Sequence, residues 1–497
     1  MDNMVRTVSE TRNADKKAIE SGTVDAQGLV RRAGRALFDA LDKTGHVKPD
    51  QEFVVFAGPG SNGLDACVLT HLLSDRVKSV RIFDLFEKNR HLREAILSEA
   101  QSSISLEDGS RKEAVEDALS HATHVIDGMF GTGFKGDPEE PVTTAVNMIN
   151  ACEATVIAID CPTGLDLGNG HASDPCIRAD LTLAIQTLKP GHLLFDGLDV
   201  CGVTKIVDIG LDPFYDGPPM IRLSEEMFAG TLNPRLHNSH KYTYGHVMAV
   251  GGSPGMMGAP YLALMAALRS GAGLATGLYQ CTDHGARFMT QPDIMDGSYS
   301  DAHTLEEQLK KASVIVFGNG MGKTGNRNEI TQTVLKQGVP VVVDADGIGL
   351  LKPFLKSPGC DIIITPHVAE AARLLDMDTK TFLEDPLDHV RRLAQVSGML
   401  VLLKGPATVL TDGINTIFST FGNPGLAKAG TGDVLAGIIA SRRAVTDDFF
   451  IAAGQALFIH GMAADIARSR RGELSMTATD LIDAIPDSIR LLMRQTD

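Results

Sequence analysis

The glycine-rich segment from Gly422 to Asp433 is the part of the chain whose residue types best suit chemistry on an anion. It reads GNPGLAKAGTGD and is followed by the apolar run Val434–Ala440, a pattern that predicts a flexible loop leading into a helix. At such a junction the backbone N–H groups of residues 429–432 would point outward, where they favour a phosphate or a developing negative charge. Asp433 in the first helical turn could take a proton from a substrate hydroxyl as a phosphoryl group arrives. The alternative is an ordinary glycine turn with an acidic residue in the first turn of the helix.

Three glycine-bearing loops in the first half also carry acidic side chains after predicted strands. They are Gly58–Asp65, Asp127–Gly136 and Ala158–Leu165, and the last of them contains Asp160. Because parallel strands end at the same edge of a sheet, we expect these loops to converge on one ligand site. Taken singly, each aspartate could instead be a helix or turn cap. Lys189, which precedes Pro-Gly, is either an assisting group at this site or a turn residue.

Positioning these loops requires parallel sheets, and the pattern of the chain predicts them. From Phe53 onward, short β-rich runs alternate with amphipathic helical stretches, which is typical of α/β domains. Turn-forming dipeptides interrupt the pattern between Gly210 and His237, so we place a boundary there and expect domains of residues 1–215 and 216–497. Helices are predicted over Val8–Leu41, with a break near Gly22.

The predicted strands of the first domain are Phe53–Ala57, Val80–Phe83, His124–Asp127, Thr155–Asp160, Leu181–Ile185 and Thr204–Ile209. Those of the second are His246–Val250, Val314–Phe317, Val339–Asp344, Asp361–Ile364 and Leu400–Leu403, with a hairpin of Ala407–Thr411 and Thr416–Ser419. Helices are expected to close the chain after Gly432.

The overall composition excludes several classes of protein. With 497 residues, 43% of them hydrophobic, the chain is long enough to build more than one core. Its formal net charge of -16 opposes binding to nucleic acid or to an acidic membrane surface, so we expect small-molecule substrates. The 50 glycines exceed the usual share of about 7% and indicate many tight loops.

The cysteines and the first residues indicate a reducing compartment. The seven cysteines are scattered and form no C-x-x-C pair, so we expect neither a disulfide framework nor a zinc site. Residues 1–17 carry mixed charges without an apolar stretch, so we predict no secretory signal and a cytoplasmic protein. The longest candidate for a membrane span, Gly258–Leu268, is interrupted by Arg269 and is too short for a bilayer, so it predicts a buried helix.

The second half resembles the ADP/ATP-dependent NAD(P)H-hydrate dehydratases, which have a ribokinase-like fold. The run GNPGLAKAGTGDVLAG carries the resemblance, and further motifs follow in the order of that family. They are His240-Lys241, GGSPGMMGA ending at Ala259, SGAG at 270–273, GNGMG at 318–322, DAD at 344–346, TPHVAE at 365–370 and LKGPAT at 403–408. Tyr242 stands where a glycine is usual and Asn319 where a proline is usual, and we expect neither to touch the anion site.

This resemblance implies repair of NAD(P)H that has added water across its nicotinamide ring. ATP or ADP would phosphorylate the new hydroxyl with Asp433 as the base, loss of phosphate would restore the double bond, and Mg²⁺ would bridge the nucleotide phosphates. The resemblance implies that the hydrated substrate contacts Ala259, Gly322, His367 and Asp433, and that the nucleotide contacts Lys404, Gly405, Pro406, Ala407, Thr408 and Gly432.

Residues 5–215 resemble the NAD(P)H-hydrate epimerase domain, which is commonly fused to such a dehydratase. The three acidic loops carry this resemblance together with LVRRAG at 29–34 and LKPG at 188–191. It implies that Asp160 binds the substrate and is catalytic, and that oxygen atoms of Asn62, Asp127 and Thr163 bind K⁺. The implied substrate-binding residues are Ser61, Asn62, Gly63, Leu64, Asp65, Gly131, Thr132, Gly133, Phe134, Lys135, Gly136, Asp137 and Asp160.

The first half departs from the epimerase pattern at three positions. Leu64 stands where glycine is usual, which places a side chain where backbone would approach a phosphate. Arg32 replaces an acidic residue, and Thr163 replaces a serine. The domain could therefore be a weakened epimerase or a binding module without turnover.

Two functions follow from these patterns. The leading hypothesis joins an N-terminal Rossmann-like α/β/α sandwich, which epimerises the R and S hydrates, to a C-terminal ribokinase-like α/β/α domain. The second domain would dehydrate the S hydrate back to NAD(P)H and release phosphate with AMP or ADP. The alternative is a kinase of a small alcohol, such as a vitamin precursor, with a non-catalytic N-terminal module. Under the leading hypothesis the partners are hydrated NADH and NADPH and an adenine nucleotide, and we expect a homo-oligomer.

Overall fold

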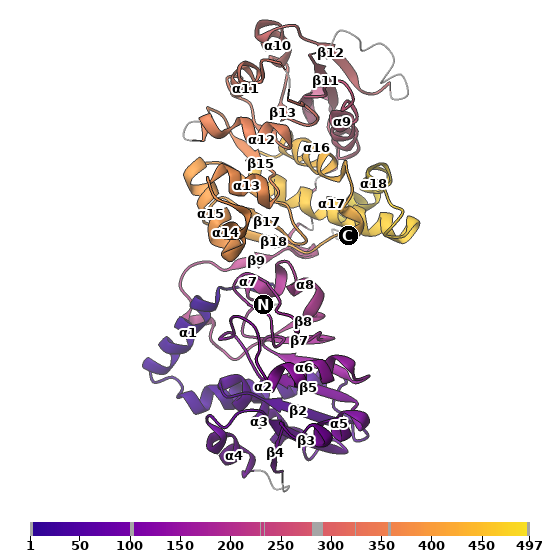
Figure 1. The fold of residues 1–497 in the computed structure, drawn as a ribbon. Helices are drawn as coiled ribbons and strands as arrows, with labels where there is room; N and C mark the ends of the chain where they lie inside the picture. Colours follow the sequence, from indigo (N-terminus) through magenta and orange to yellow (C-terminus); the bar gives the residue numbers. More distant parts are fainter. Residues whose placement is uncertain are drawn as a thin grey trace. The chain divides into compact units, whose positions relative to one another are not determined.

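The chain divides into two compact units, each built around its own sheet (Figure 1). They span Met1–Met220 and Ile221–Asp497. The structure, a computed structural model, describes residues 3–99, 104–228, 230–232, 234–280, 292–323, 325–355 and 359–494. The cysteines among these residues are free thiols, and Cys281 lies outside the described residues.

The first unit is a three-layered α/β/α sandwich around a parallel sheet of order β4-β3-β2-β5-β6-β7-β8. Its strands are β2 (Glu52–Ala57), β3 (Ser79–Asp84), β4 (Leu106–Asp108), β5 (His124–Gly128), β6 (Thr155–Ile159), β7 (Leu181–Ile185) and β8 (Val203–Val207). Its helices include α1 (Val8–Glu20), α2 (Ala26–Lys43), α3 (Ser61–Leu73), α4 (Arg90–Leu97), α5 (Lys112–His121), α6 (Val142–Ala151), α7 (Pro190–Leu193) and α8 (Gly197–Val200). The two-residue strand β1 (Met4–Val5) bridges to Leu188.

Successive side chains of each strand point to opposite faces of the sheet, so the apolar side chains form two cores. Phe53 and Val55 of β2 pack in one cluster with side chains of α2, α3 and α4. Val54 and Phe56 pack on the opposite face in a second cluster with α5 and α6. Both faces of the sheet are therefore buried, as the crossover helices of a parallel sheet require.

The second unit has a longer, mixed sheet of order β9-β18-β17-β16-β15-β14-β13-β10-β11-β12. Pairing is parallel from β12 through β16, antiparallel between β16, β17 and β18, and parallel between β18 and β9. The strands are β9 (Met220–Arg222), β10 (His246–Val250), β11 (Leu274–Tyr279), β12 (Met295–Ser298), β13 (Val314–Phe317), β14 (Val341–Val343), β15 (Ile362–Ile364), β16 (Leu400–Leu403), β17 (Thr408–Thr411) and β18 (Thr416–Ser419).

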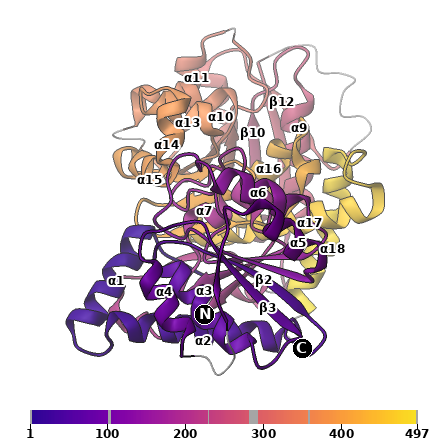
Figure 2. The ribbon, with the colours of Figure 1, turned by 60° about the horizontal axis from the view of Figure 1, so that its bottom comes forward.

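Helices cover both faces of this sheet (Figure 2). On one side lie α9 (Gly258–Arg269), α16 (Thr431–Arg443), α17 (Phe449–Arg471) and α18 (Ala478–Arg494), which share one core cluster with the strands. On the other lie α10 (Ala302–Leu309), α11 (Arg327–Leu335), α12 (Asp346–Leu350), α13 (Val368–Leu374), α14 (Thr379–Glu384) and α15 (Pro386–Ser397). A Cβ on Gly437 of α16 would lie 1.9 Å from the carbonyl oxygen of Ala263 in α9, so the glycine permits the close crossing of these two helices.

The predicted fold class is confirmed, with a few local differences. The strand predicted to end at Asp160 ends at Ile159, because Asp160 adopts a positive φ of 59°. Strand β11 was not predicted, and Gly277 interrupts its apolar pattern. Gly258–Leu268 is a buried helix as expected, but it is not the longest apolar helix. In the part of the chain that the structure describes, α17 is long and apolar enough to span a membrane, and 61% of its most apolar window is buried inside the structure as core.

Candidate active sites

A cavity of about 740 Å³ opens in the first unit, where loops after β2, β5 and β6 meet. Among the predicted residues, its wall includes Ser61, Asn62, Leu64, Asp65, Gly131, Thr132 and Asp160. Leu64 lies in the first turn of α3 and is half-buried, so its side chain occupies part of the cavity wall. Gly63 is buried and does not line the cavity, and neither do the remaining predicted residues, Gly133, Phe134, Lys135, Gly136 and Asp137.

The glycines of the first loop are required by close backbone approaches. A Cβ on Gly58 would lie 1.6 Å from the carbonyl oxygen of Met129, and a Cβ on Gly63 would lie 1.9 Å from that of Gly58. The loop after β2 therefore folds tightly against the loop after β5, and α3 begins at Ser61, facing the cavity.

Asp160 is held at the end of β6 by three neighbours. Lys189 Nζ lies 2.5 Å from its Oδ1, and the backbone N–H of Ile185 donates to the same oxygen at 3.0 Å. His192 Nδ1 accepts from the Lys189 backbone N–H, so its Nε2 carries the proton and donates to the Asp160 carbonyl at 2.7 Å. The Lys189 side chain is fully buried. The turn interpretation of Lys189 is therefore incomplete, because its ammonium group is a counter-ion at the cavity.

Two further carboxyl groups line the same cavity. Burial raises the pKa of Asp65 well above its usual range, and the charges of Asp160 and Asp15 act in the same direction. Burial likewise raises the pKa of Asp15 to about 6, opposed by the charge of Lys189. Sequence reasoning missed Asp15. The signal that could have found it is an acidic residue next to Ala14, on the face of α1 that buries Thr11, Ala14 and Ala18.

Of the residues expected to bind K⁺, Asp127 and Thr163 contact each other, and Asn62 lines the cavity. Thr163 donates to both oxygens of Asp127, from its hydroxyl at 2.8 Å and from its backbone N–H at 2.7 Å. Asn62 Nδ2 donates to the carbonyls of Phe130 and Ile159, while its Oδ1 is buried without a hydrogen-bond partner among the described residues. The orphaned amide oxygen of Asn62 and the hydroxyl and carboxylate oxygens of Thr163 and Asp127 are donors of the type that suits a hard cation such as K⁺.

The second site lies at the N-terminus of α16. Gly430, with a φ of 94°, precedes the helix, and Gly432 and Asp433 lie in its first turn. A Cβ on Gly432 would lie 3.5 Å from Lys404 Nζ and 3.8 Å from Asp344 Oδ2. The helix N-terminus, a lysine and two aspartates therefore surround one spot.

Hydrogen bonds hold the loop before α16 in its conformation. Thr431 Oγ1 donates to the carbonyls of Leu426 and Lys428, and Lys428 Nζ donates to the carbonyl of Met476 at 2.8 Å. His460 Nε2 donates to the Thr431 carbonyl at 3.0 Å, and burial lowers the pKa of His460 to about 4, so this imidazole is neutral. These contacts hold the N–H groups of the helix start in place.

Asp433 belongs to a network that the sequence did not foresee. Asn319 Nδ2 donates to Asp433 Oδ1 at 2.6 Å and to Asp344 Oδ2 at 3.0 Å. Asp344 Oδ1 in turn accepts from Lys404 Nζ at 2.7 Å and from Thr365 Oγ1 at 2.7 Å. Asn319, expected to lie away from the anion site, therefore contacts its carboxylate. The expectation was wrong because Asn319 follows β13, next to β14 in the sheet, and both strands end beside α16.

The other residues predicted to bind substrate lie in loops around this site. A Cβ on Gly320 would lie 3.2 Å from Ala259 Cβ, so the GNGMG loop contacts the start of α9. The Gly322 N–H donates to Asp346 Oδ2 at 2.8 Å. His367 caps α13, where its Nδ1 accepts from the Glu370 N–H, and its backbone bridges to Lys404.

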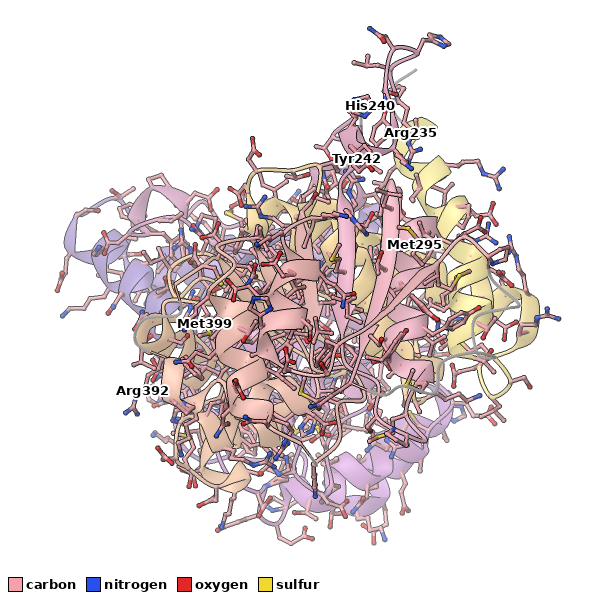
Figure 3. All side chains as sticks on the ribbon, turned by 90° about the horizontal axis from the view of Figure 1, so that it is seen from above. Arg235, His240, Tyr242, Met295, Arg392 and Met399 are labelled. Atoms are coloured by element: carbon pink, nitrogen blue, oxygen red, sulfur yellow. The ribbon has the colours of Figure 1, made fainter. Side chains whose placement is uncertain are left out.

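The predicted nucleotide segment begins with Lys404 at the end of β16, and Gly405 and Pro406 are exposed. Ala407 is buried, and Thr408 begins β17. The His240-Lys241 motif lies at an edge of the view in Figure 3, where His240 and Tyr242 project with Arg235. A Cβ on Gly273 would lie 1.8 Å from the carbonyl oxygen of Lys241, so the His240-Lys241 motif packs tightly against the SGAG turn.

Known proteins match both units of the chain. The family described as NAD(P)H-hydrate dehydratase matches residues 247–487, and the one described as YjeF-related protein N-terminus matches residues 26–191. The bifunctional NAD(P)H-hydrate repair enzyme Nnr of Moorella thermoacetica is 32% identical over 523 residues, covering 99% of this chain and 97% of the relative. The chain belongs to the bifunctional NAD(P)H-hydrate repair family.

Further comparisons agree with membership of the NAD(P)H-hydrate repair family. The enzyme of the same name from Coxiella burnetii is 31% identical, covering 95% of this chain and 96% of the relative. A solved ribokinase-like superfamily protein from Enterococcus faecalis is 27% identical with a TM-score of 0.50, covering 55% of this chain and 96% of that one. The chain is thus an NAD(P)H-hydrate repair enzyme, and membership of this family favours the two-reaction hypothesis over the small-alcohol kinase.

Proposed function

We propose that the first unit epimerises the R and S hydrates of NAD(P)H and that the second dehydrates the S hydrate with ATP or ADP. The assignment of dehydration to the second unit rests on the position of Asp433 in the first turn of α16, beside Lys404. The proposed domain ranges are 1–215 for the epimerase and 216–497 for the dehydratase. A cytoplasmic location and a homo-oligomeric state stay predictions.

In the dehydration, Asp433 accepts the proton of the substrate hydroxyl as that oxygen attacks the terminal phosphorus of the nucleotide. The new O–P bond forms as the bond to ADP or AMP breaks, while the N–H groups at the start of α16 and Lys404 stabilise the negative charge of the phosphoryl group. The carbon–oxygen bond then breaks, phosphate departs with the electron pair, and loss of a ring proton restores the double bond. We assign Ala259, Gly322 and His367 to the hydrated nucleotide, and Lys404, Gly405, Pro406, Ala407, Thr408 and Gly432 to ATP or ADP.

Mg²⁺ fits this site as a partner of the nucleotide phosphates. Among the described residues no group of three His, Cys, Asp or Glu side chains forms a ready metal cage. Asp344 and Asp433 provide two carboxylates, and Mg²⁺ usually binds through one or two carboxylates together with substrate phosphates. When bound it would neutralise charge on the transferring phosphoryl group.

In the epimerisation, Asp160 and Asp65 supply the proton-transferring groups. Hydration of an enamine places the hydroxyl on the carbon bonded to nitrogen, so inversion can proceed by loss of water to an iminium and return of water to the other face. Asp65, protonated because burial raises its pKa, can donate to the leaving hydroxyl, and Asp160 beside Lys189 can take the proton from the returning water. Asn62, Asp127 and Thr163 would hold K⁺, which would supply positive charge near the substrate phosphates.

The test of the dehydratase assignment uses the full chain with Asp433→Asn and, as a control, Asp412→Asn in the exposed β17–β18 turn. S-hydrated NADH and ATP are mixed with each protein, and return of the NADH absorbance is followed. Asp433→Asn should abolish this recovery while nucleotide binding stays measurable by calorimetry, and Asp412→Asn should match the wild type. Recovery by Asp433→Asn at the wild-type rate would remove Asp433 from the role of base. If the wild type shows no recovery but phosphorylates a vitamin-like alcohol, the kinase alternative holds.

A further inference from the structure

Asn89 joins the start of α4 to the loop that precedes α3 in the first unit. Its Nδ2 donates to the carbonyl oxygen of Pro59 at 2.8 Å, and Asn89, Pro59 and Gly60 all line the cavity. Asn89 occupies the N-cap position of α4 in a left-handed conformation with a φ of 60°. An N-cap residue usually has extended backbone and bonds the first N–H groups of its helix, whereas the Asn89 side chain makes no such capping bond in the described part of the chain. The side chain therefore serves the neighbouring loop and not its own helix.

Arg93, one turn after Asn89, holds the same loop. The Arg93 side chain has no exposed surface, and its Nη1 donates to the carbonyl oxygen of Gly58 at 3.1 Å. Its Nη2 lies 2.6 Å from Asp84 Oδ2, at the end of β3. The carbonyl oxygens of Gly58 and Pro59, in two successive peptides, thus both accept from side chains at the start of α4. A left-handed residue other than glycine, fixed by its surroundings in this way, is typical of functional sites.

The sequence of the loop does not by itself fix the peptide between Pro59 and Gly60. Glycine tolerates either sign of φ, and a Cβ on Gly60 would meet no described atom within 4 Å, so local sterics do not choose the orientation of this peptide. Because the N–H of a trans peptide points away from its carbonyl oxygen, the bond from Asn89 turns the Gly60 N–H away from Asn89. In the opposite orientation the carbonyl oxygen of Pro59 would take the place of that N–H on the cavity wall.

We propose that Asn89 is a positioning residue for the epimerisation, which keeps the Pro59 carbonyl oxygen from facing the phosphates of the substrate. The inference rests on the proposed function, in which the first unit binds a dinucleotide with two phosphate groups. A carbonyl oxygen turned toward these anions would repel them, whereas a backbone N–H in the same place would attract them. The bond from Asn89 therefore acts on the affinity for the substrate and not on the proton transfers at Asp160.

The experiment measures kcat and KM of the full chain for conversion of the R hydrate of NADH to the S hydrate. Nucleotide is left out so that the second unit does not consume the product, and chromatography separates the two hydrates. The variants are Asn89→Gly, which keeps the left-handed backbone and removes the donor, and Asn89→Asp, which places a carboxylate against the carbonyl oxygen. Asn147→Ala, at an exposed asparagine of α6, is the control.

The expected change is in KM. In Asn89→Gly, KM should rise about threefold to tenfold with kcat within about twofold of the wild type, because one hydrogen bond that supports substrate binding is lost. In Asn89→Asp the rise should be larger, because a carboxylate cannot donate to the carbonyl oxygen and adds a negative charge on the cavity wall. Asn147→Ala should match the wild type in both constants.

The outcomes separate this inference from the proposed function. An unchanged KM in Asn89→Gly overturns the inference, while the proposed function stands. A fall in kcat that exceeds the rise in KM also overturns it, because it would show a structural role. If either variant does not fold, the other decides. Absence of conversion of the R hydrate by the wild type would remove the proposed epimerase function itself.

Discussion

Replacement of Lys189 by methionine should stop epimerisation and leave dehydration intact. The Lys189 side chain has no exposed surface, and its Nζ lies 2.5 Å from Asp160 Oδ1 and 2.8 Å from the carbonyl oxygen of Ile185. Methionine has a similar length and volume without the charge, so the change removes the counter-ion and keeps most of the packing.

The size of the effect follows from this burial. Removing one partner of a buried ion pair costs about 3–5 kcal/mol, because here the Asp160 carboxylate would be left without its counter-ion. Asp15, whose pKa burial raises to about 6, lies on the same cavity, and its ionised form opposes another negative charge there. Without the ammonium group of Lys189 beside it, Asp160 is no longer held as a base for water, and loss of a general base costs about 10²–10⁴-fold in rate.

The assay supplies ATP and an equilibrated mixture of the R and S hydrates to the full chain. The wild type should convert the whole mixture to NADH. Lys189→Met should convert the S fraction at the normal rate and the R fraction at least about a hundredfold more slowly, and Asp160→Asn should give the same arrest. Lys112→Met, at a lysine whose side chain is 62% exposed, is the matched control. Consumption of both fractions by Lys189→Met at the wild-type rate would refute the argument.

Two further predictions concern the stability of the separate units. Gly437→Ala should destabilise the second unit by about 1–3 kcal/mol or more, because its Cβ would lie 1.9 Å from the Ala263 carbonyl oxygen, whereas Gly349→Ala, with nothing within 4 Å, should be neutral or stabilising. Hydrogen exchange of α9 and α16 measures this, and unchanged protection in Gly437→Ala would contradict it. In the first unit, burial and the charges of His46 and Lys48 lower the pKa of His124 to about 4, so the unfolded state binds the extra proton. The free energy of unfolding of the first unit should therefore fall by roughly 3 kcal/mol as the pH is lowered from about 6.5 to about 4. In His124→Gln this free energy should depend less on pH, and hydrogen exchange of β5 measures it.

The sequence predicted those parts of the two sites whose position depends on residues close by in the sequence. The glycine-rich loop before an apolar run predicted that Asp433 lies in the first turn of a helix, as it does in α16. This prediction does not depend on where the helix packs, because local backbone and capping preferences set the start of a helix. The acidic loops after β2, β5 and β6 could likewise be expected at one edge, since parallel strands share their direction.

The sequence by itself thus determined the two α/β units, their loops and the carboxylates at their strand and helix ends. Only the tertiary structure decided which groups control those carboxylates. Lys189 is 29 residues from Asp160, and Asn319 is 114 residues from Asp433. Such pairs depend on the order of strands and on which helix covers which end of the sheet, and these are set by packing of the whole core. Local patterns therefore located the two aspartates, but the buried ammonium beside one and the amide beside the other followed from the assembled fold.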